Sequence, residues 1–166
     1  MKVSLIMAQT LDGIISRSSN EFVDWTGNAD KRFFVRATKK AGVIIMGSRT
    51  YDTIGRPLPG RKNVVLTRNK SRISNDANLV FTSQEPQKLL LDLKAEGYKS
   101  VALIGGSEIN SLFAKLNLID EVFVTIAPRL FGIGLTLFNV SLDCNLQLVS
   151  SETLEENYVL LHYKVV

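Results

Sequence analysis

Cysteine and histidine are scarce in this sequence, and their scarcity excludes several classes of function. Cys144 is the single cysteine, so no disulfide forms within the chain, which is typical of proteins from a reducing compartment. His162 is the single histidine, and no metal-ligand cluster of known spacing is present. The sequence also has no Gly-x-Ser-x-Gly turn, no Walker phosphate loop and no cysteine–histidine nucleophile pair. We therefore expect no metal site and none of the activities that depend on these motifs.

Long apolar runs are missing as well. Residues 1–10 are largely apolar, but this run is too short for a signal peptide and far too short to span a bilayer. The net charge of +4 suits an anionic ligand, yet the basic residues are scattered and are not interleaved with aromatic residues as on a nucleic-acid stacking surface. We expect a cytoplasmic protein that binds neither membranes nor nucleic acid. No exposed aromatic stripe is evident, so we also expect a monomer.

What the sequence does contain is a regular alternation of short apolar runs with amphipathic stretches, without a repeat or a linker. This alternation predicts one α/β domain over residues 1–166, with a twisted, mostly parallel central sheet, flanking helices and an antiparallel C-terminal strand. Asn28 is expected to cap the first helix, and the polar stretch of residues 9–26 before it is expected to be a functional loop. Strands are expected at residues 3–8, 42–46, 62–67, 79–82, 100–104, 121–126, 147–152 and 158–165, and helices at residues 28–40, 48–53, 85–96 and 107–116.

Two glycine-containing turns point to a dinucleotide. Gly105-Gly106-Ser107-Glu108 and Gly47-Ser48-Arg49-Thr50 each follow an apolar strand and open a helix, where glycines let a phosphate approach backbone N–H groups. Thr67-Arg68 follows a third strand. Each turn could instead be a tight connection without a ligand, and Arg49 and Arg68 could be solvated surface residues. Because ligands bind beyond the carboxyl ends of parallel strands, the loops expected to form a site are those after Ala8, Met46, Leu66 and Ile104.

One acid lies close to the single tryptophan. In Trp25-Thr-Gly-Asn-Ala-Asp30 a carboxylate at the start of a helix could hold an amidine-like ring through a bidentate pair and help a proton reach it. Asp30 could equally compensate the helix dipole, and Asp24 is a competing acid. Arg61 ends a rigid, basic turn at residues 55–61 and could clamp a carboxylate or simply be exposed. Hydride transfer suits a sequence that has these residues but no nucleophile motif and no metal site, because the cofactor then carries the chemistry.

The sequence resembles the bacterial type of the dihydrofolate reductase family over residues 4–125, most specifically in VIIMGSRTYDTIGRPLPGRKNVVLTR at residues 43–68. The resemblance implies that family's fold and the NADPH-dependent reduction of 7,8-dihydrofolate to tetrahydrofolate, with hydride to C6 and a proton to N5. It implies that Asp30 is the active-site carboxylate, with Trp25 beside it and Thr125 supporting it. The dihydrofolate-binding residues that it implies, besides Asp30 and Thr125, are Ala8, Phe34, Ile54, Leu58 and Arg61, the last as the arginine for the glutamate carboxylate.

The same resemblance implies an NADPH site. Ala8 and Ile15 would frame the nicotinamide, and residues 9–23 would form a mobile lid that excludes water. Gly105 and Gly106 match the glycine pair by the pyrophosphate, which a cis peptide joins in the family. The cofactor-binding residues expected from the turns and the resemblance together are Ala8, Ile15, Gly47, Ser48, Arg49, Thr50, Leu66, Thr67, Arg68, Ile104, Gly105, Gly106, Ser107, Glu108 and Ile109.

Some positions depart from the dihydrofolate reductase pattern. Ser48 stands where many relatives carry an arginine toward the 2′-phosphate, so a preference for NADPH over NADH would depend on Arg49 and Arg68. Lys31 stands beside the acid where an apolar residue is usual. The segment APRLFGIGLTLF at residues 127–138 is similar to the related reductase domain of riboflavin biosynthesis.

These departures leave alternatives to dihydrofolate reduction. The first is a riboflavin-pathway reductase that acts on a phosphorylated ribosylaminopyrimidine, in which Arg61 would meet a phosphate. The second is a protein that binds NADPH without catalysis. The pairing of Asp30 with Arg61 argues against the second alternative, because a sensor does not need a clamp for a pterin.

Overall fold

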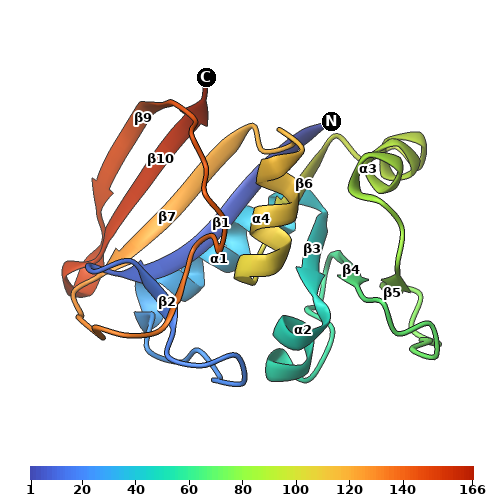
Figure 1. Ribbon diagram of the computed structural model, residues 1–166, viewed down its shortest axis with the longest axis horizontal. Coiled ribbons are helices and arrows are strands. Elements are labelled where there is room, and N and C mark those ends of the chain that lie inside the picture. The colour runs from blue at the N-terminus through green and yellow to red at the C-terminus, as the bar shows by residue number, and fades with distance from the viewer.

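The structure, a computed structural model, describes residues 1–166 apart from the side chain of Glu156. An eight-stranded sheet forms its centre, in the order β5-β4-β3-β6-β1-β7-β10-β9 (Figure 1). Strand β10 runs antiparallel to β7 and β9, and the remaining neighbouring pairs are parallel, which confirms the predicted fold class. The strands of this sheet are β1 (Lys2–Thr10), β3 (Val43–Gly47), β4 (Lys62–Leu66), β5 (Leu79–Thr82), β6 (Ser100–Leu103), β7 (Glu121–Ala127), β9 (Leu146–Thr153) and β10 (Val159–Val165), with the short 3-10 helix η1 (Glu155–Asn157) between the last two.

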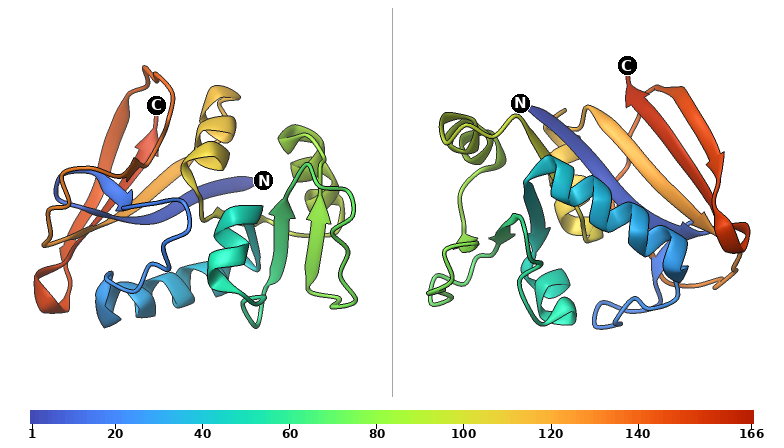
Figure 2. Two further views of the ribbon diagram at one scale, coloured as in Figure 1. Left: turned by 60° about the horizontal axis from the view of Figure 1, so that its bottom comes forward. Right: turned by 180° about the vertical axis from the view of Figure 1, so that it is seen from behind.

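Helices cover both faces of this sheet. Helix α1 (Gly27–Ala41) packs on one face, and α3 (Pro86–Ala95) and α4 (Ser107–Lys115) pack on the other (Figures 1 and 2). Helix α2 (Ser48–Ile54) follows directly after β3. None of the helices in the described part of the chain combines the length and the apolar character that a membrane-spanning helix needs.

The two ends of α1 differ in how well the sequence predicts them. The prediction that Asn28 caps this helix is wrong, because the helix begins at Gly27 and Thr26 precedes it. Trp25 and Thr26 are buried, so packing turns the chain into the helix before it reaches Asn28. At the other end Gly42 adopts the left-handed conformation with φ 78°, and its N–H donates to carbonyl oxygens of the last turn.

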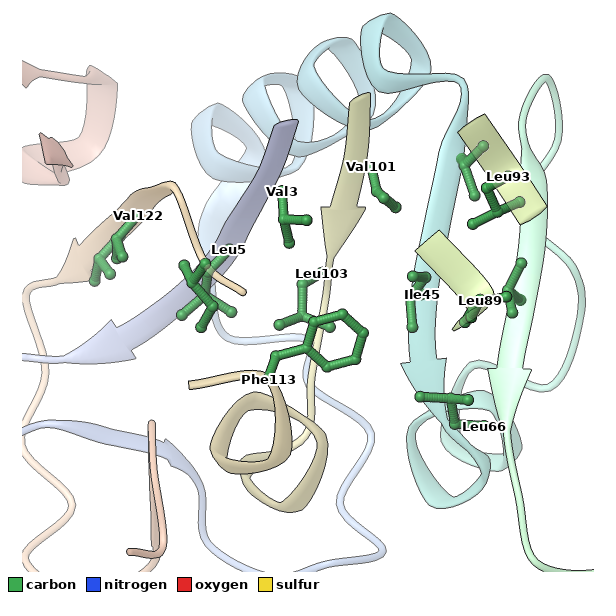
Figure 3. Packing of buried hydrophobic residues seen from close by; sticks show 14 residues of the cluster. Val3, Leu5, Ile45, Leu66, Leu89, Leu93, Val101, Leu103, Phe113 and Val122 are labelled. Atoms are coloured by element: carbon green, nitrogen blue, oxygen red, sulfur yellow. The ribbon is translucent and has the colours of Figure 1, made fainter. Parts of the chain in front are cut away.

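Two hydrophobic clusters form because successive side chains of a strand point to opposite faces of the sheet. On β3, Val43 and Ile45 belong to the cluster under α3 and α4, whereas Ile44 and Met46 belong to the cluster under α1. Phe113 of α4 is fully buried in the first cluster, next to side chains of β6 (Figure 3). Both faces are covered, so the central strands appear in the sequence as continuous apolar runs.

The stretch at residues 9–26 is only in part the loop that the sequence predicts. It contains β2 (Ile14–Ser16), which pairs with β8 (Leu135–Thr136) in a separate two-stranded sheet. The prediction is wrong at this point because β2 has 3 residues, too few to show a period in the sequence, and its partner is distant along the chain.

Asp12 connects this stretch to the segment that follows β7. Its carboxylate accepts hydrogen bonds from the backbone N–H groups of Phe131 (3.0 Å) and Gly132 (2.6 Å). The hydroxyl of Thr10 also donates to it, and these hydrogen bonds hold the pKa of Asp12 below its ordinary value. Asp12 is therefore a turn residue that also fixes a second loop.

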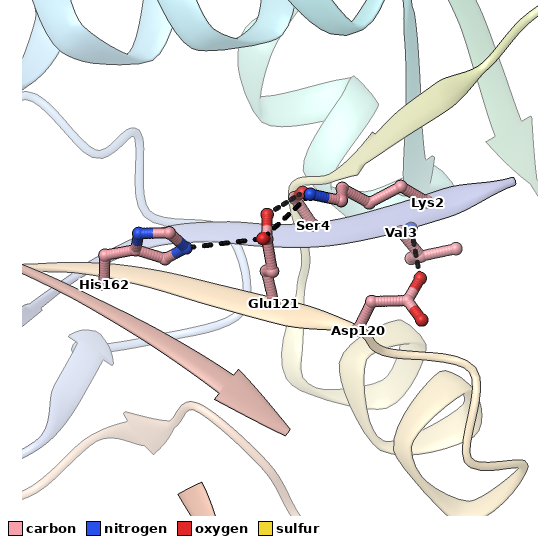
Figure 4. Close-up of polar contacts among 6 residues, drawn as sticks. All are labelled: Lys2, Val3, Ser4, Asp120, Glu121 and His162. Carbon is pink, nitrogen blue, oxygen red and sulfur yellow. Dashed lines mark hydrogen bonds and ion pairs between the residues drawn. The ribbon is translucent and has the colours of Figure 1, made fainter. Parts of the chain in front are cut away.

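An ionic cluster around the buried Glu121 joins β1, β7 and β10 at the amino-terminal end of β7. Glu121 accepts hydrogen bonds from Lys2 Nζ at 2.9 Å and Ser4 Oγ at 3.5 Å (Figure 4). His162 Nε2 lies 3.7 Å from Glu121 Oε1, and the imidazole stacks on Phe123 at 4.0 Å. Burial alone would raise the pKa of Glu121, but Lys2, His162 and Ser4 outweigh it, so the pKa lies below its ordinary value. His162 is thus a packed residue of the sheet.

Candidate active site

A cleft of about 1270 Å³ opens beyond the carboxyl ends of β1, β3, β4, β5 and β6. In a parallel sheet these ends meet at one edge, so segments far apart in the chain border the same space. The loops in which the sequence predicts a site, those after Ala8, Met46, Leu66 and Ile104, all border this cleft. The N-terminal half of α1, the connection before it and β8 complete the walls.

Asp30 is the buried carboxylate of the cleft. Its exposed fraction is 8%, and it lies on α1 where that helix passes over the carboxyl end of β1. Burial raises the pKa of Asp30, because desolvation disfavours the charged carboxylate. The hydroxyl groups of Thr125 and Thr26 and the charge of Lys31 oppose this rise without cancelling it. The carboxyl group therefore keeps its proton to a higher pH than an exposed aspartate does.

Thr125 and Trp25, the residues predicted to support this acid, are buried and lie outside the cleft lining. Thr125 is the β7 partner of Ala8 on β1 and is 1% exposed. Its hydroxyl completes no well-aligned hydrogen bond with the described residues, but it lies close enough to Asp30 to lower the pKa. Trp25 packs edge-on against Phe131, with ring centroids 5.1 Å apart. Neither Trp25 nor Thr125 lines the cleft, so their catalytic roles stay predictions of indirect support.

An apolar wall stands beside Asp30. Phe34 of α1, Ile54 of α2 and Leu58 after α2 all line the cleft, as the resemblance implies. Asn63 fixes this wall: its Oδ1 accepts from the Leu58 N–H at 2.8 Å, and its Nδ2 donates to the Leu58 carbonyl at 3.0 Å. Asn63 is fully buried, and an asparagine at the start of an apolar strand is the sequence signal that could have shown this role.

Arg61 is not among the residues that line the cleft. It is 5% exposed, and its guanidinium donates from Nε to the Pro59 carbonyl at 3.1 Å and from Nη1 to the Thr38 hydroxyl. Burial lowers the pKa of Arg61, and no carboxylate of the described residues pairs with it. The structure therefore places the predicted tail-binding arginine just behind the wall, with two of its donors already used.

The predicted dinucleotide turns lie together at the other end of the cleft. The Gly47 N–H donates to the Gly105 carbonyl at 2.9 Å, which joins the ends of β3 and β6. A Cβ at Gly47 would lie 2.9 Å from the Ile109 side chain, so only glycine allows this approach. The peptide between Gly105 and Gly106 is cis, as the resemblance implies. Of the predicted cofactor residues, those that line the cleft are Ala8, Ile15, Gly47, Ser48, Arg49, Thr50, Leu66, Thr67, Arg68, Ile104, Gly106, Ser107, Glu108 and Ile109.

The two predicted phosphate-binding arginines differ in their surroundings. Arg49 forms an ion pair with Glu108 of α4, and both side chains are largely exposed. Arg68 forms no ion pair with any residue that the structure describes. Of the two guanidinium groups, Arg68 is the one that is free to meet an anion.

The family model for dihydrofolate reductase matches residues 2–158. The chain belongs to the dihydrofolate reductase family. A dihydrofolate reductase of Staphylococcus haemolyticus is 30% identical over 125 residues, which cover 75% of this chain and 69% of that protein. The family is one of reductases, so the chain is an oxidoreductase.

Solved structures show the same fold in a related group of proteins. A structure described as a riboflavin biosynthesis protein of Shewanella sp. PV-4 has a TM-score of 0.86 at 22% identity and covers 100% of this chain and 99% of that one. RibD of Acinetobacter baumannii has a TM-score of 0.84 at 21% identity over 99% of this chain and 58% of that one. At these identities the likeness concerns the fold.

This member of the dihydrofolate reductase family also has a cleft wall that the sequence did not predict. Gly134, Leu135 and Thr136 line the cleft, although they follow β7 and belong to no predicted turn. Polar side chains of α4 hold this segment, which we name the strap (residues 131–139). Ser107, Asn110 and Ser111 are buried polar residues on the otherwise amphipathic helix α4, and they are the sequence signal that could have revealed the strap. The contacts run from Ser107 Oγ to the Thr136 carbonyl, from Asn110 Nδ2 to the Leu137 carbonyl (2.9 Å), and from the Asn139 N–H to Ser111 Oγ (2.9 Å).

Proposed function

We propose that the protein reduces 7,8-dihydrofolate to tetrahydrofolate with NADPH, with hydride to C6 and a proton to N5. The observation that carries this proposal is the buried carboxyl group of Asp30, whose pKa is raised, at one end of a cleft whose other end has glycine-lined strand ends. The cleft volume of about 1270 Å³ exceeds the roughly 300–1,000 Å³ of a usual single-ligand pocket, so a cofactor and a substrate fit in it side by side. The similarity to the dihydrofolate reductase of S. haemolyticus supports the same reaction.

The residues of the glycine-lined end fit NADPH. When bound, this cofactor supplies the hydride. The glycines at positions 47, 105 and 106 place no side chain at the start of α4, where backbone N–H groups would face a pyrophosphate. Arg68, with no ion-pair partner among the described residues, would hold the 2′-phosphate. Ala8 and Ile15 line the cleft between this end and Asp30, where a nicotinamide would meet the substrate ring.

Asp30 would hold the substrate ring and keep a proton available to it. A carboxyl group accepts and donates at two oxygens, which matches the amidine edge of a pterin. Its raised pKa keeps a larger fraction protonated near neutral pH, and this favours proton transfer toward N5. Phe34, Ile54 and Leu58 form the apolar wall that would pack on the aryl group of the substrate. Positioning the two rings face to face would supply much of the rate enhancement.

The test is NADPH consumption, followed by absorbance, with purified protein and dihydrofolate. We expect turnover by the parent and a loss of about 10²–10⁴-fold in Asp30→Asn, the usual contribution of a general acid. The loss should be greatest at neutral pH, where proton supply limits the rate. Asp24→Asn is the matched control, because Asp24 is exposed and close in sequence, and it should retain the parent rate. Equal turnover in Asp30→Asn and the parent would contradict the role given to Asp30.

A second candidate is reduction of the ribosyl side chain of a phosphorylated aminopyrimidine. Residues 127–138, which include most of the strap, favour it, because their sequence resembles that of riboflavin-pathway reductases. The solved structure of a riboflavin biosynthesis protein also shares the fold over the whole chain. Turnover of the aminopyrimidine together with inactivity toward dihydrofolate would establish this candidate. NADPH binding in a fluorescence titration without turnover of either substrate would contradict both.

A further inference from the structure

Strand β9 is exposed along its whole length. It forms one edge of the eight-stranded sheet, and no α-helix lies over it (Figures 1 and 2). Its 8 residues, Leu146–Thr153, are all exposed. Its backbone pairs with β10 on one side, and none of the residues that the structure describes pairs with the other side. β9 therefore presents a row of free N–H and C=O groups to solvent.

Proteins usually protect the edges of their sheets, and β9 has few of the usual protections. The opposite edge strand, β5, has 4 residues, whereas β9 has 8. β9 contains no lysine and no proline, and Glu152 is its single charged residue. Three of its side chains are apolar, and their exposed fractions are 45% at Leu146, 53% at Leu148 and 48% at Val149. Such an edge is suited to pairing with another strand.

A β-bulge makes β9 complementary to a second copy of itself. Val149 is the extra residue of the bulge and has no partner on β10. Because of this extra residue, Leu148 and Ser151 both lie on the α4 face of the sheet. For the same reason Gln147 and Glu152 both lie on the α1 face. Opposite residues of an antiparallel pair share a face, so a two-fold axis at the bulge brings Leu148 opposite Ser151 of the second copy. It also brings Gln147 opposite Glu152 of the second copy.

This alignment matches the two copies in charge and in apolar surface. The Gln147 amide would face the Glu152 carboxylate of the second copy, and Lys164 lies next to Gln147 on β10. The two Glu152 carboxylates would lie at opposite ends of the interface, whereas parallel pairing would place them side by side. On the other face, the half-buried side chains of Leu161 and Tyr163 on β10 would join those of the second copy in one apolar surface.

We propose that the protein forms a homodimer in which the two β9 strands pair antiparallel about the bulge, so that the two central sheets become one. A closed two-fold pair is the commonest oligomer of soluble proteins. β10 and β7 separate β9 from β1, the nearest strand of the sheet that borders the cleft, so the pairing leaves the cleft open. The proposal is therefore independent of the reductase function proposed above. It departs from the monomer expected from the sequence, in which an edge strand has the same pattern as a paired one.

Sedimentation equilibrium of the full chain over about a hundredfold range of concentration tests this proposal. We expect a monomer–dimer equilibrium for the parent and a loss of association in Leu148→Lys, because a lysine on the edge strand opposes pairing. Ile73→Lys is the matched control, because Ile73 is 84% exposed and lies outside the strands, and it should keep the parent dissociation constant. A parent that stays monomeric, or a dimer that Leu148→Lys leaves intact, would overturn the proposal.

A charge exchange tests the alignment of the two strands. Glu152→Lys should weaken association about tenfold, because each of the two symmetric contacts loses its carboxylate and gains an ammonium group near Lys164. Adding Gln147→Glu to this variant should restore the parent dissociation constant, because the new carboxylate would face the new ammonium group across the interface. Equal association of the parent and Glu152→Lys, or no recovery in the double variant, contradicts the antiparallel alignment.

Amide hydrogen exchange identifies the paired edge directly. Exchange in β9 should slow as the protein concentration rises, while exchange in β5, the other edge strand, should stay the same. Exchange in β9 that does not depend on concentration, in a sample that contains dimers, would place the interface elsewhere and refute the proposal.

Discussion

Replacing Asp30 by asparagine should make the ligand-free protein more stable at neutral pH while it removes activity. The folded protein holds the Asp30 proton to a higher pH than the unfolded chain, in which an aspartate titrates near pH 3.9. Between these two values the folded state binds more protons than the unfolded state, so the free energy of unfolding falls as the pH rises through this window. Above the window the parent stays less stable than it would be with a neutral side chain. Asparagine avoids this cost because it does not ionise.

The size of this effect follows from the burial of the group. Asp30 is 8% exposed, so solvent screens its charge little. Each tenfold difference in acid dissociation constant between the folded and unfolded states corresponds to about 1.4 kcal/mol. For a chain of 166 residues, each kcal/mol changes the melting temperature by about 2–4 °C. We therefore expect Asp30→Asn to melt above the parent at pH 7, by about 3–6 °C for each tenfold difference in dissociation constant, and the difference to vanish on acidification toward pH 4.

Thermal denaturation of the parent, Asp30→Asn and Asp24→Asn across this pH range measures the effect. Asp24→Asn removes the same charge from an exposed site and should follow the parent at each pH. The reasoning is refuted if Asp30→Asn melts at or below the parent temperature at pH 7. That result would mean that the hydroxyl groups of Thr26 and Thr125 and the charge of Lys31 fully compensate the buried carboxylate.

Two further predictions concern the cofactor half of the cleft. Gly134→Ala should lower stability by about 1–3 kcal/mol and weaken NADPH binding, because its Cβ would lie 2.4 Å from Ile14 Cγ2 and 2.5 Å from the Ser16 carbonyl oxygen. Thermal denaturation measures the change in stability, and a fluorescence titration with NADPH measures the change in binding. Unchanged values would show that the strap moves freely. Arg68→Gln should raise the KM for NADPH about tenfold and leave that for NADH unchanged. Arg49→Gln should have the smaller effect, because Arg49 is already paired with Glu108, and the reverse order would contradict our assignment of the 2′-phosphate to Arg68.

The parts of the fold that the sequence predicted are those in which local patterns and tertiary packing agree. The strand at residues 43–47 is apolar throughout because both of its faces are covered. Glycines or a proline stand at the ends of the predicted helices, as Pro86 does at the start of α3. The small sheet of β2 and β8 could not be predicted. Its pairing of Ile14 with Thr136 depends on contacts between distant segments, such as those of Asp12 with the N–H groups of Phe131 and Gly132.

The site shows the same division between local and long-range information. Asp30, Phe34 and Leu58 were predicted by resemblance, and all three line the cleft. The resemblance could not show that Arg61 would donate to Thr38 and Pro59 behind the wall, because that depends on how the turn packs on α1. Nor could it show the strap, whose place depends on the polar groups of α4.

The strap bears on the choice between the two candidate substrates through its place in the cleft. Its sequence is similar to that of riboflavin-pathway reductases, yet its contacts are with Ser107 and Asn110 of α4 and with β2, which adjoin the predicted cofactor residues Ile15 and Ile109. The two candidate reactions would draw on the same cofactor, so the place of the strap at that end weakens the support that its sequence lends to the second candidate. We expect the substrate to be distinguished at the other end, where Asp30 and its apolar wall line the cleft. The similarity of the strap is therefore compatible with dihydrofolate reduction, and substitutions at the Asp30 end of the cleft, not in the strap, should change which substrate is used.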